Sequence, residues 1–275
     1  MNNLRQIALA MHNFHAAFNQ FPPAVIYGPD GKPWHSWRVL ILPYLDRADL
    51  YNAYDFSQPW DSPRNKALID QMPPVYRDPI HGQARDTYTN YAALVGPGAI
   101  FRLEGAKQTD PKTPPLGKGG VGMENILDGT SNTLMAAPVE PGRKIPWTKP
   151  EDIDVGPTFT GFGQPKGIAA PYTFLGPGGG KAAPLAFADG SVRMIGASVN
   201  RLVLEALITC AGGEVIAADS FPVEPPPGGA SDERRTLKIR VRDRKTTAVI
   251  DVENVLSAPQ PKRAIREFRK AEINR

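Results

Sequence analysis

The sequence MNNLRQIALAMHNFHAAF, residues 1–18, decides the fold of this chain. Its apolar side chains recur at intervals of three and four residues, so they share one face of an α-helix. That face holds Leu4, Ile7 or Ala8, Met11, Phe14 or His15, and Phe18. Because a short helix is only marginally stable in isolation, we expect this face to be buried against the rest of the protein.

The same helix lacks an ordinary start signal. Only Met1, Asn2 and Asn3 precede Leu4, and no capping Ser, Thr or Asp is followed three residues later by Glu. Its end is clear, because the two prolines at 22–23 cannot continue a helical ladder. We therefore expect the natural helix to have an upstream part that this sequence lacks.

The composition is that of a globular protein rich in loops. Of the 275 residues, 41% are hydrophobic and 22% are charged, which excludes a disordered chain. Pro (29) and Gly (26) are abundant and predict long loops, many turns and short strands. No run approaches the roughly 18 apolar residues of a transmembrane helix, and no signal peptide is visible.

Motifs for catalysis and for cofactors are missing from the sequence. It contains no Gly-x-Ser-x-Gly, no His-Glu-x-x-His and no Gly-x-x-x-x-Gly-Lys-Ser/Thr. Four His and one Cys supply few groups for acid–base chemistry near neutral pH. Cys210 lies in the apolar run LVLEALITC, where we expect a buried core residue rather than a nucleophile. We therefore expect neither an enzyme nor a bound cofactor.

Further elements follow from local patterns. Strands are expected near residues 89–95, 133–139 and 184–195. Within the last of these, Asp189-Gly190 predicts a β-hairpin with a two-residue type I′ turn and no ligand. A helix is expected over 198–209, with Ser198 as its candidate cap.

The C-terminal part differs from the rest in charge. Residues 221–275 hold 13 Lys or Arg and 8 Asp or Glu, whereas the whole chain has a net charge of +4. FPVEPPPGGASDE, residues 221–233, has the composition of a linker. Residues 234–256 predict two antiparallel strands, because the basic residues of TLKIRVRD alternate with apolar ones and would face solvent. We expect this hairpin to dock on the main body and to bind DNA only weakly.

Several positions are candidates for ligand or metal binding. An aromatic binding surface would consist of Trp34, His35, Trp37, Tyr44 and Trp60. A structural cluster is the alternative, because aromatic side chains contribute strongly to protein cores. His12 and His15 lie three residues apart on the helix, but a metal site needs a third ligand that the sequence does not supply nearby.

Two Asp-Gly turns carry additional oxygen groups. They are Asp128-Gly129-Thr130-Ser131-Asn132 and Asp189-Gly190-Ser191. Calcium favours oxygen-rich turns, which makes Asp128 a weak calcium candidate. No Asp-x-Asp-x-Asp pattern with a closing Glu accompanies it, and turn chemistry alone explains both segments. We therefore predict no metal at either turn.

Four segments resemble one bacterial family in the same order. They are NNLRQIALAMHNFHAAFNQFPPA, SWRVLILPYLDRADLYNAYDFSQPWDSPRNKAL, ILDGTSNTLMAAPVE and LAFADGSVRMI, and the resemblance spans about residues 2–216. The family is the prepilin-like domain of unknown function 1559, also labelled solute-binding protein family 10. The resemblance implies a type IV pilin-like fold, whose N-terminal helix follows a membrane anchor.

Two features depart from the family pattern. The leader, the cleavage and methylation site and the roughly 20 apolar residues that precede the first segment in relatives are absent from this sequence. The closing family motif is a His followed by nine residues and Asp-Gly, and Gly179 stands at the His position. Any role of that His in binding or packing would be missing here.

Together, the residues and the resemblance predict an α+β chain. Residues 1–220 would form a pilin-like domain with its N-terminal helix on an antiparallel sheet, residues 221–233 a linker, and residues 234–275 a basic β-hairpin and tail. The resemblance implies a non-enzymatic structural or interaction protein of the cell envelope, a pseudopilin or minor-pilin-like subunit of a type II secretion or type IV pilus-like system. Its partners would be itself or other pilin-like subunits, without nucleic acid, and with membrane contact only through the missing upstream helix. The alternative is a module that binds a small solute or glycan through its aromatic surface.

Overall fold

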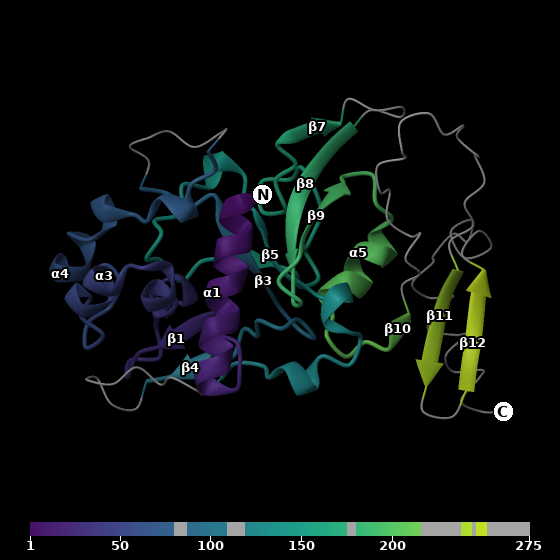
Figure 1. The fold of residues 1–275 in the computed structure, drawn as a ribbon, viewed down its shortest axis with the longest axis horizontal. Coiled ribbons are helices and arrows are strands. Elements are labelled where there is room, and N and C mark those ends of the chain that lie inside the picture. Colours follow the sequence, from purple (N-terminus) through teal and green to yellow (C-terminus); the bar gives the residue numbers. More distant parts are fainter. Residues whose placement is uncertain (80–86, 109–118, 175–179, 216–237, 244–245, 252–275) are drawn as a thin grey trace. The chain divides into compact units, whose positions relative to one another are not determined.

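The computed structural model describes residues 1–79, 87–108, 119–174, 180–215, 238–243 and 246–251. The chain divides into two compact units, Met1–Gly212 and Gly213–Arg275. Helices, antiparallel pairs and mixed sheets occur together, which confirms the predicted α+β class (Figure 1). Gly179 and the predicted linker 221–233 lie outside the described residues.

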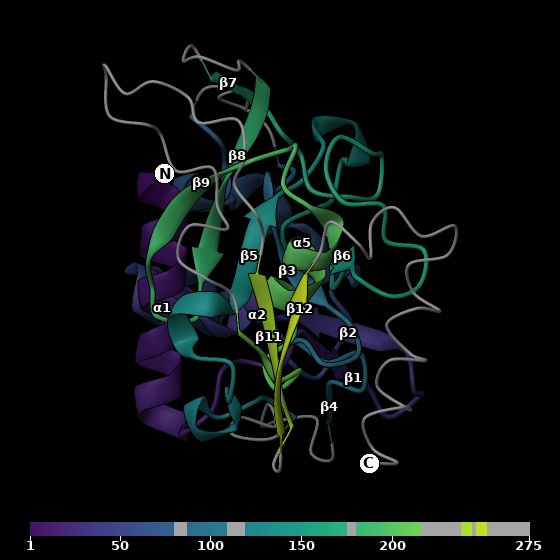
Figure 2. The ribbon, with the colours of Figure 1, turned by 90° about the vertical axis from the view of Figure 1, so that its right-hand side faces the viewer.

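Helix α1 (Asn2–Phe18) opens the first unit. Its buried side is apolar and comprises Leu4, Ile7, Ala8, Ala10, Met11 and Phe14. Phe18 is partly buried against the same core, and the helix ends at Asn19 in a left-handed backbone conformation (φ 57°). Figures 1 and 2 show α1 running alongside the main sheet, where it contacts β5 (Leu134–Pro138) and β8 (Gly180–Phe187).

The main sheet has the strand order β6–β3–β5–β8–β7, and β9 also pairs with β8. Its further strands are β3 (Tyr91–Val95), β6 (Ile153–Asp154), β7 (Tyr172–Phe174) and β9 (Val192–Gly196). These pairs are antiparallel except that of β3 with β6. Strands β3 and β5 are buried along their whole length, as their uninterrupted apolar sequences YAALV and LMAAP require.

The turn between β8 and β9 corrects the prediction of a two-residue type I′ turn. The amide of Gly190 donates to the Phe187 carbonyl, and the Phe187 amide donates to the Ser191 carbonyl. Gly190 has a positive φ of 81°, whereas Asp189 does not. The loop therefore has three residues, a type I turn followed by a left-handed glycine. The Asp189 carboxylate fixes this form by accepting a hydrogen bond from the Ser191 amide.

A smaller sheet and a series of short helices complete the first unit. The sheet has the order β2–β1–β4 and consists of β1 (Val25–Tyr27), β2 (Pro33–Ser36) and β4 (Ala106–Lys107). The α-helices are α2 (Trp37–Leu40), α3 (Ala48–Ala53), α4 (Pro63–Lys66) and α5 (Arg201–Ile208). The 3-10 helices are η1 (Leu42–Leu45), η2 (Ile69–Gln71), η3 (Pro74–Tyr76), η4 (Met123–Asn125), η5 (Thr130–Asn132) and η6 (Pro141–Arg143).

Side chains cap several of these helices. Ser36 accepts from the Arg38 amide at the start of α2, and Ser62 accepts from the Asn65 amide at the start of α4. Helix α5 corrects the expectation of a cap at Ser198, because Asn200 accepts from the amide two residues later. Ser and Asn are both strong caps, so the sequence alone does not choose between two candidates so close together.

The second unit contains a three-stranded antiparallel sheet in the order β10–β11–β12. Its strands are β10 (Glu214–Val215), β11 (Lys238–Asp243) and β12 (Thr246–Asp251). The pairing of β11 with β12 agrees with the hairpin expected in 234–256. The docking of this hairpin on the main body stays a prediction.

Within the described ranges, no helix combines the length and the apolarity that crossing a bilayer requires.

Candidate functional site

The residues of the predicted aromatic surface divide between core and exterior. His35 and Trp37 are completely buried, whereas Trp34, Tyr44 and Trp60 keep part of their surface in solvent. The Trp60 amide donates to the Trp34 carbonyl, which joins these two residues. Tyr44 instead packs edge-on against an aromatic ring of α1. The five side chains therefore do not make one exposed surface.

His35 belongs to a closed polar cluster. Its Nδ1 lies 3.0 Å from the Tyr54 hydroxyl, and its Nε2 lies 3.2 Å from the Phe56 carbonyl and 3.1 Å from Gln108 Oε1. Two acceptors face Nε2, so this nitrogen carries the proton and Nδ1 accepts from Tyr54. Burial lowers the pKa of His35 to about 4, because the charged ring would lose its hydration. The ring is therefore neutral at neutral pH.

Trp37 and Arg38 meet at the carboxylate of Asp152. Asp152 Oδ1 accepts from Trp37 Nε1 at 3.0 Å, from Arg38 Nη2 at 2.8 Å and from the Ala93 amide at 2.9 Å. Arg38 also donates to the Tyr91 carbonyl through Nε and Nη2. The exposed side-chain fractions are 0% for Arg38 and 6% for Asp152. These residues, the Asp152 cluster, join α2, β3 and the chain before β6, so their role is structural.

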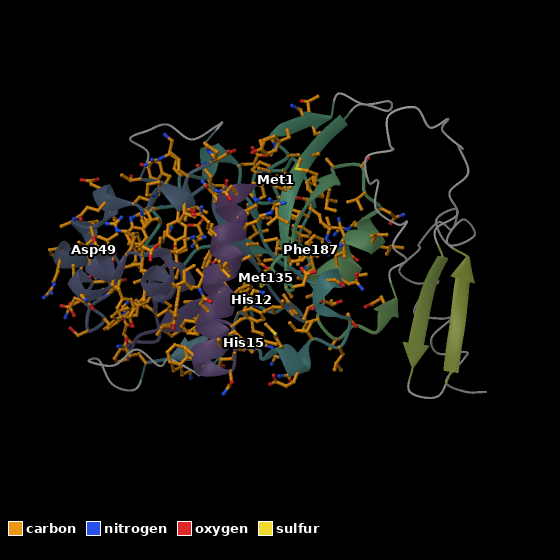
Figure 3. The ribbon with its side chains drawn as sticks, in the orientation of Figure 1. Met1, His12, His15, Asp49, Met135 and Phe187 are labelled. Atoms are coloured by element: carbon orange, nitrogen blue, oxygen red, sulfur yellow. The ribbon has the colours of Figure 1, made fainter. Side chains whose placement is uncertain are left out.

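Helix α1 contacts the β8–β9 turn through His12. A Cβ on Gly190 would lie 3.4 Å from His12 Nε2, a buried atom without a hydrogen-bond partner in the described part of the chain. Burial lowers the pKa of His12, and its ring packs edge-on against Phe21. His15 lies one turn further along α1 (Figure 3), where its Nε2 accepts from the Met123 amide. Each histidine thus makes its own contact with a neighbouring segment.

The structure brings the two Asp-Gly segments together. The Asp189 amide donates to the Thr130 carbonyl at 3.0 Å, and Arg193 of β9 donates to the Ser131 carbonyl. Gly129 has a φ of 92°, and the Asn132 side chain donates to the carbonyl of Asp128. Residues far apart in the sequence therefore form one junction, where β5 begins and β8 ends.

The Asp128 carboxylate has a partner within the fold. Its Oδ2 accepts from the Gly212 amide at 2.7 Å, and the amides of Leu127 and Asp128 both donate to the Cys210 carbonyl. Among the residues that the structure describes, no three His, Cys, Asp or Glu side chains gather as a metal site would require. Cys210 is buried, and burial raises the pKa of its thiol, which disfavours the reactive thiolate.

The outward side of α1 is nearly uncharged. Its exposed residues are Asn2, Arg5, Gln6, Leu9, Asn13, Ala16 and Ala17. Arg5 is the only Lys, Arg, Asp or Glu in the helix, and Leu9 is 61% exposed. Helices that face solvent ordinarily carry charged and polar residues there, whereas the centres of protein interfaces are depleted of charge. This side, the outer face of α1, is the candidate interaction site.

These observations define an α+β protein with an amphipathic N-terminal helix beside a mainly antiparallel sheet. The chain belongs to the family described as a protein of unknown function (DUF1559), which matches residues 1–158. This confirms the resemblance drawn from the sequence motifs. The matched range includes α1, the Asp152 cluster and the Asp128 turn, but it ends before the turn at 189–191. No curated protein and no solved structure matches the chain.

Proposed function

We propose that this chain is a non-enzymatic structural and interaction protein of the cell envelope, a pseudopilin or minor-pilin-like subunit. The outer face of α1 carries the proposal. One side of the helix packs its apolar residues on the core. The other side exposes Leu9 and two alanines among three uncharged polar residues, with one charge at Arg5. A second helix or a sheet can pack against such a surface while removing few charged groups from water.

The proposed partners are further copies of this chain or other pilin-like subunits. Family membership supports this choice, because the segment NNLRQIALAMHNFHAAF resembles the part of a pilin-like helix that follows the membrane anchor. Leu9 and Ala16 are seven residues apart and share one stripe of the helix. The aromatic alternative has less support, because His35 and Trp37 have no exposed surface.

Site-specific cross-linking tests the proposal. Cys210 is the single cysteine of the chain and is buried, so Leu9→Cys places one accessible thiol on the outer face of α1. In cells that naturally make the protein, we expect it to fractionate with the envelope. A bismaleimide should then join Leu9→Cys chains to each other or to another pilin-like subunit.

The matched control is Lys66→Cys, at an exposed position of α4. This variant should fractionate identically but cross-link much less. Recovery of the protein in the cytosol would contradict the envelope assignment. Equal cross-linking from Leu9→Cys and Lys66→Cys would contradict the assignment of the outer face as the interface.

A further inference from the structure

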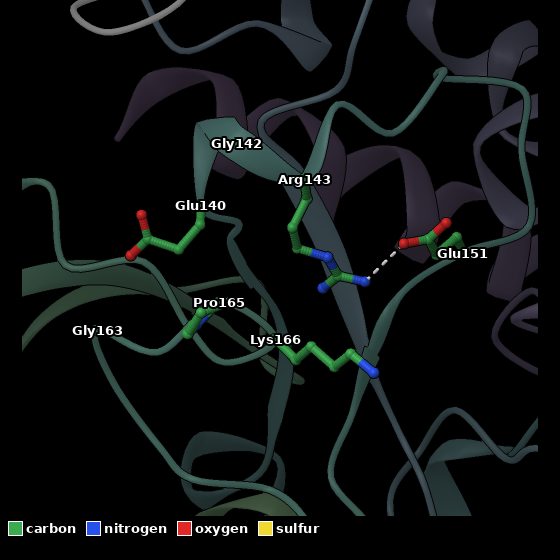
Figure 4. A pocket seen from close by; sticks show the side chains of 7 residues that line it. All are labelled: Glu140, Gly142, Arg143, Glu151, Gly163, Pro165 and Lys166. Carbon is green, nitrogen blue, oxygen red and sulfur yellow. Dashed lines mark hydrogen bonds and ion pairs between the residues drawn. The ribbon is translucent and has the colours of Figure 1, made fainter.

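A hollow of about 570 Å³ lies where η6 approaches the segments at 149–152 and 163–166 (Figure 4). Its charged lining consists of Glu140, Arg143, Glu151 and Lys166. The remaining lining is two glycines, at 142 and 163, and a proline. The volume falls in the range of about 300–1,000 Å³ that is usual for small-molecule sites.

Arg143 has a buried nitrogen, Nη1, that bonds to no residue the structure describes. Its Nη2 donates to Glu151 Oε1 at 3.0 Å and to the Asp152 carbonyl at 2.8 Å. Its Nη1 is buried without a hydrogen-bond partner. A buried polar group that lacks a partner costs free energy, and the cost is larger for a charged group. A ligand with an acceptor oxygen would remove this cost.

Some charged groups of the lining form ion pairs with described residues and others do not. Lys149 contacts Glu151 Oε2 at 2.6 Å, so Glu151 already has Arg143 and Lys149 as partners. Lys166 is exposed and forms no ion pair with a described residue, and neither does Glu140. The lining thus holds two cations and two carboxylates, of which Arg143 and Glu151 form an ion pair, while the Lys166 ammonium has no described counterion. Figure 4 shows the Arg143 guanidinium and the Lys166 side chain directed into the same space.

We propose that this hollow binds the carboxylate of a small organic acid between Arg143 and Lys166. The carboxylate would pair with the Lys166 ammonium, and one of its oxygens would supply the acceptor that Nη1 lacks. A dianionic phosphate would bring a second negative charge beside Glu140 and Glu151, which repel it. This binding activity is separate from the interaction role of α1.

The glycines keep the hollow open to the ligand. A Cβ added at either glycine would meet no heavy atom within 4 Å, which shows unfilled space beside both backbones. Gly163 also has a positive φ of 69°, a conformation that side chains with a Cβ rarely adopt. Nη1 is covered in this structure, so binding requires lining side chains to part. Exposed Lys166 forms no ion pair with a residue of the described ranges, so none of these holds it in place.

Nuclear magnetic resonance with isotope-labelled full-length protein tests the proposal. Acetate is the probe, and acetamide is its neutral counterpart of nearly equal shape, both titrated at constant ionic strength near neutral pH. We expect acetate to cause saturable shifts of the amides of Gly142, Arg143 and Gly163, and acetamide to cause none. Lys166→Gln should weaken acetate binding by about fivefold.

Lys181→Gln is the matched control, because Lys181 is another exposed lysine and does not line the hollow. It should leave the acetate affinity unchanged. The proposal fails if acetamide produces the same shifts, or if acetate produces no saturable shift. It also fails if inorganic phosphate binds more tightly than acetate, or if both lysine variants lose affinity equally.

Discussion

Arg38 and Arg143 both bind the segment 149–152, but their surroundings differ. Arg38 is fully buried, and its donors reach the Asp152 carboxylate, the Tyr91 carbonyl and other oxygens at distances up to 3.5 Å. The Arg143 side chain is 12% exposed and leaves Nη1 without an acceptor beside the hollow. A guanidinium whose donors are all used can only hold the fold together. One that leaves a buried nitrogen unbonded behind a hollow can also take a ligand once the side chains that cover it part.

The largest expected effect comes from replacing Arg38, the arginine whose donors are all hydrogen-bonded. Arg38→Met keeps much of the side-chain volume but leaves Asp152 without its buried cation. We expect a loss of about 3–5 kcal/mol in the free energy of unfolding, because removing one partner strands a buried charge. Urea denaturation measures it. Arg38→Met together with Asp152→Asn should recover part of the loss, and a single-variant loss below about 1 kcal/mol would show that the pair is not effectively buried.

His35 extends the comparison to a second fully partnered side chain. Its pKa falls from 6.5 to about 4 in the folded protein, so the unfolded chain takes up the proton first as the pH drops. The contribution of His35 to stability is therefore intact above pH 6.5 and is lost as the pH falls to about 4. From the pKa difference, the loss is about 3 kcal/mol.

Denaturation across this pH window checks the expectation. His35→Gln cannot titrate, so its free energy of unfolding should fall by about 3 kcal/mol less than that of the unchanged protein over the same window. Equal pH dependence of the two proteins would mean that His35 is accessible to protons in the folded state.

Gly190→Val tests the contact between the β8–β9 turn and His12, whose Nε2 has no hydrogen-bond partner among the described residues. Gly190→Val introduces a β-branched side chain at a φ of 81° and places its Cβ close to His12 Nε2. We expect a loss of about 1–3 kcal/mol, from backbone strain and from displacement of His12. Thermal unfolding measures the loss. Gly190→Asn should cost less, because Asn tolerates this backbone region.

Arg143→Gln should have the smallest effect on the free energy of unfolding. It tests directly whether Arg143 contributes less to stability than Arg38. It removes an ion pair with Glu151, whose side chain is 35% exposed, and one hydrogen bond to a carbonyl. Solvent screening reduces the value of such a pair, so we expect a loss of about 1 kcal/mol or less. A loss equal to that of Arg38→Met would place Arg143 among the structural residues and remove the basis for treating the two arginines differently.

The sequence predicted the elements whose signals are local. The spacing of Leu4, Ile7 and Met11 indicated the buried side of α1. The strands expected near 89–95 and 133–139 correspond to β3 and β5. The exposure of individual aromatics was not predictable in this way. Trp34 and Trp37 are three residues apart, yet only Trp37 is enclosed, because its indole reaches Asp152.

The sequence could not predict contacts between distant segments. Asp152 meets Arg38 across more than 100 residues, and no local pattern distinguishes Asp152 from other acidic residues. Arg143 and Lys166 lie in a stretch rich in Pro and Gly, a composition that predicts loops but not which side chains meet. Only the folded chain brings these two cations to the same hollow. The type I turn at Asp189 was not predicted for a different, local reason. Asp-Gly suits both the two-residue and the three-residue turn.

The junction of the two Asp-Gly segments has a consequence for evolutionary variation. The Asp189 amide donates to the Thr130 carbonyl, and the Ala188 amide donates to the Thr133 carbonyl. Both links use main-chain atoms alone, so they depend on the number of residues between positions 130 and 133. A one-residue insertion between these positions would shift one carbonyl away from its donor. Relatives should therefore conserve the length of the segment between these positions.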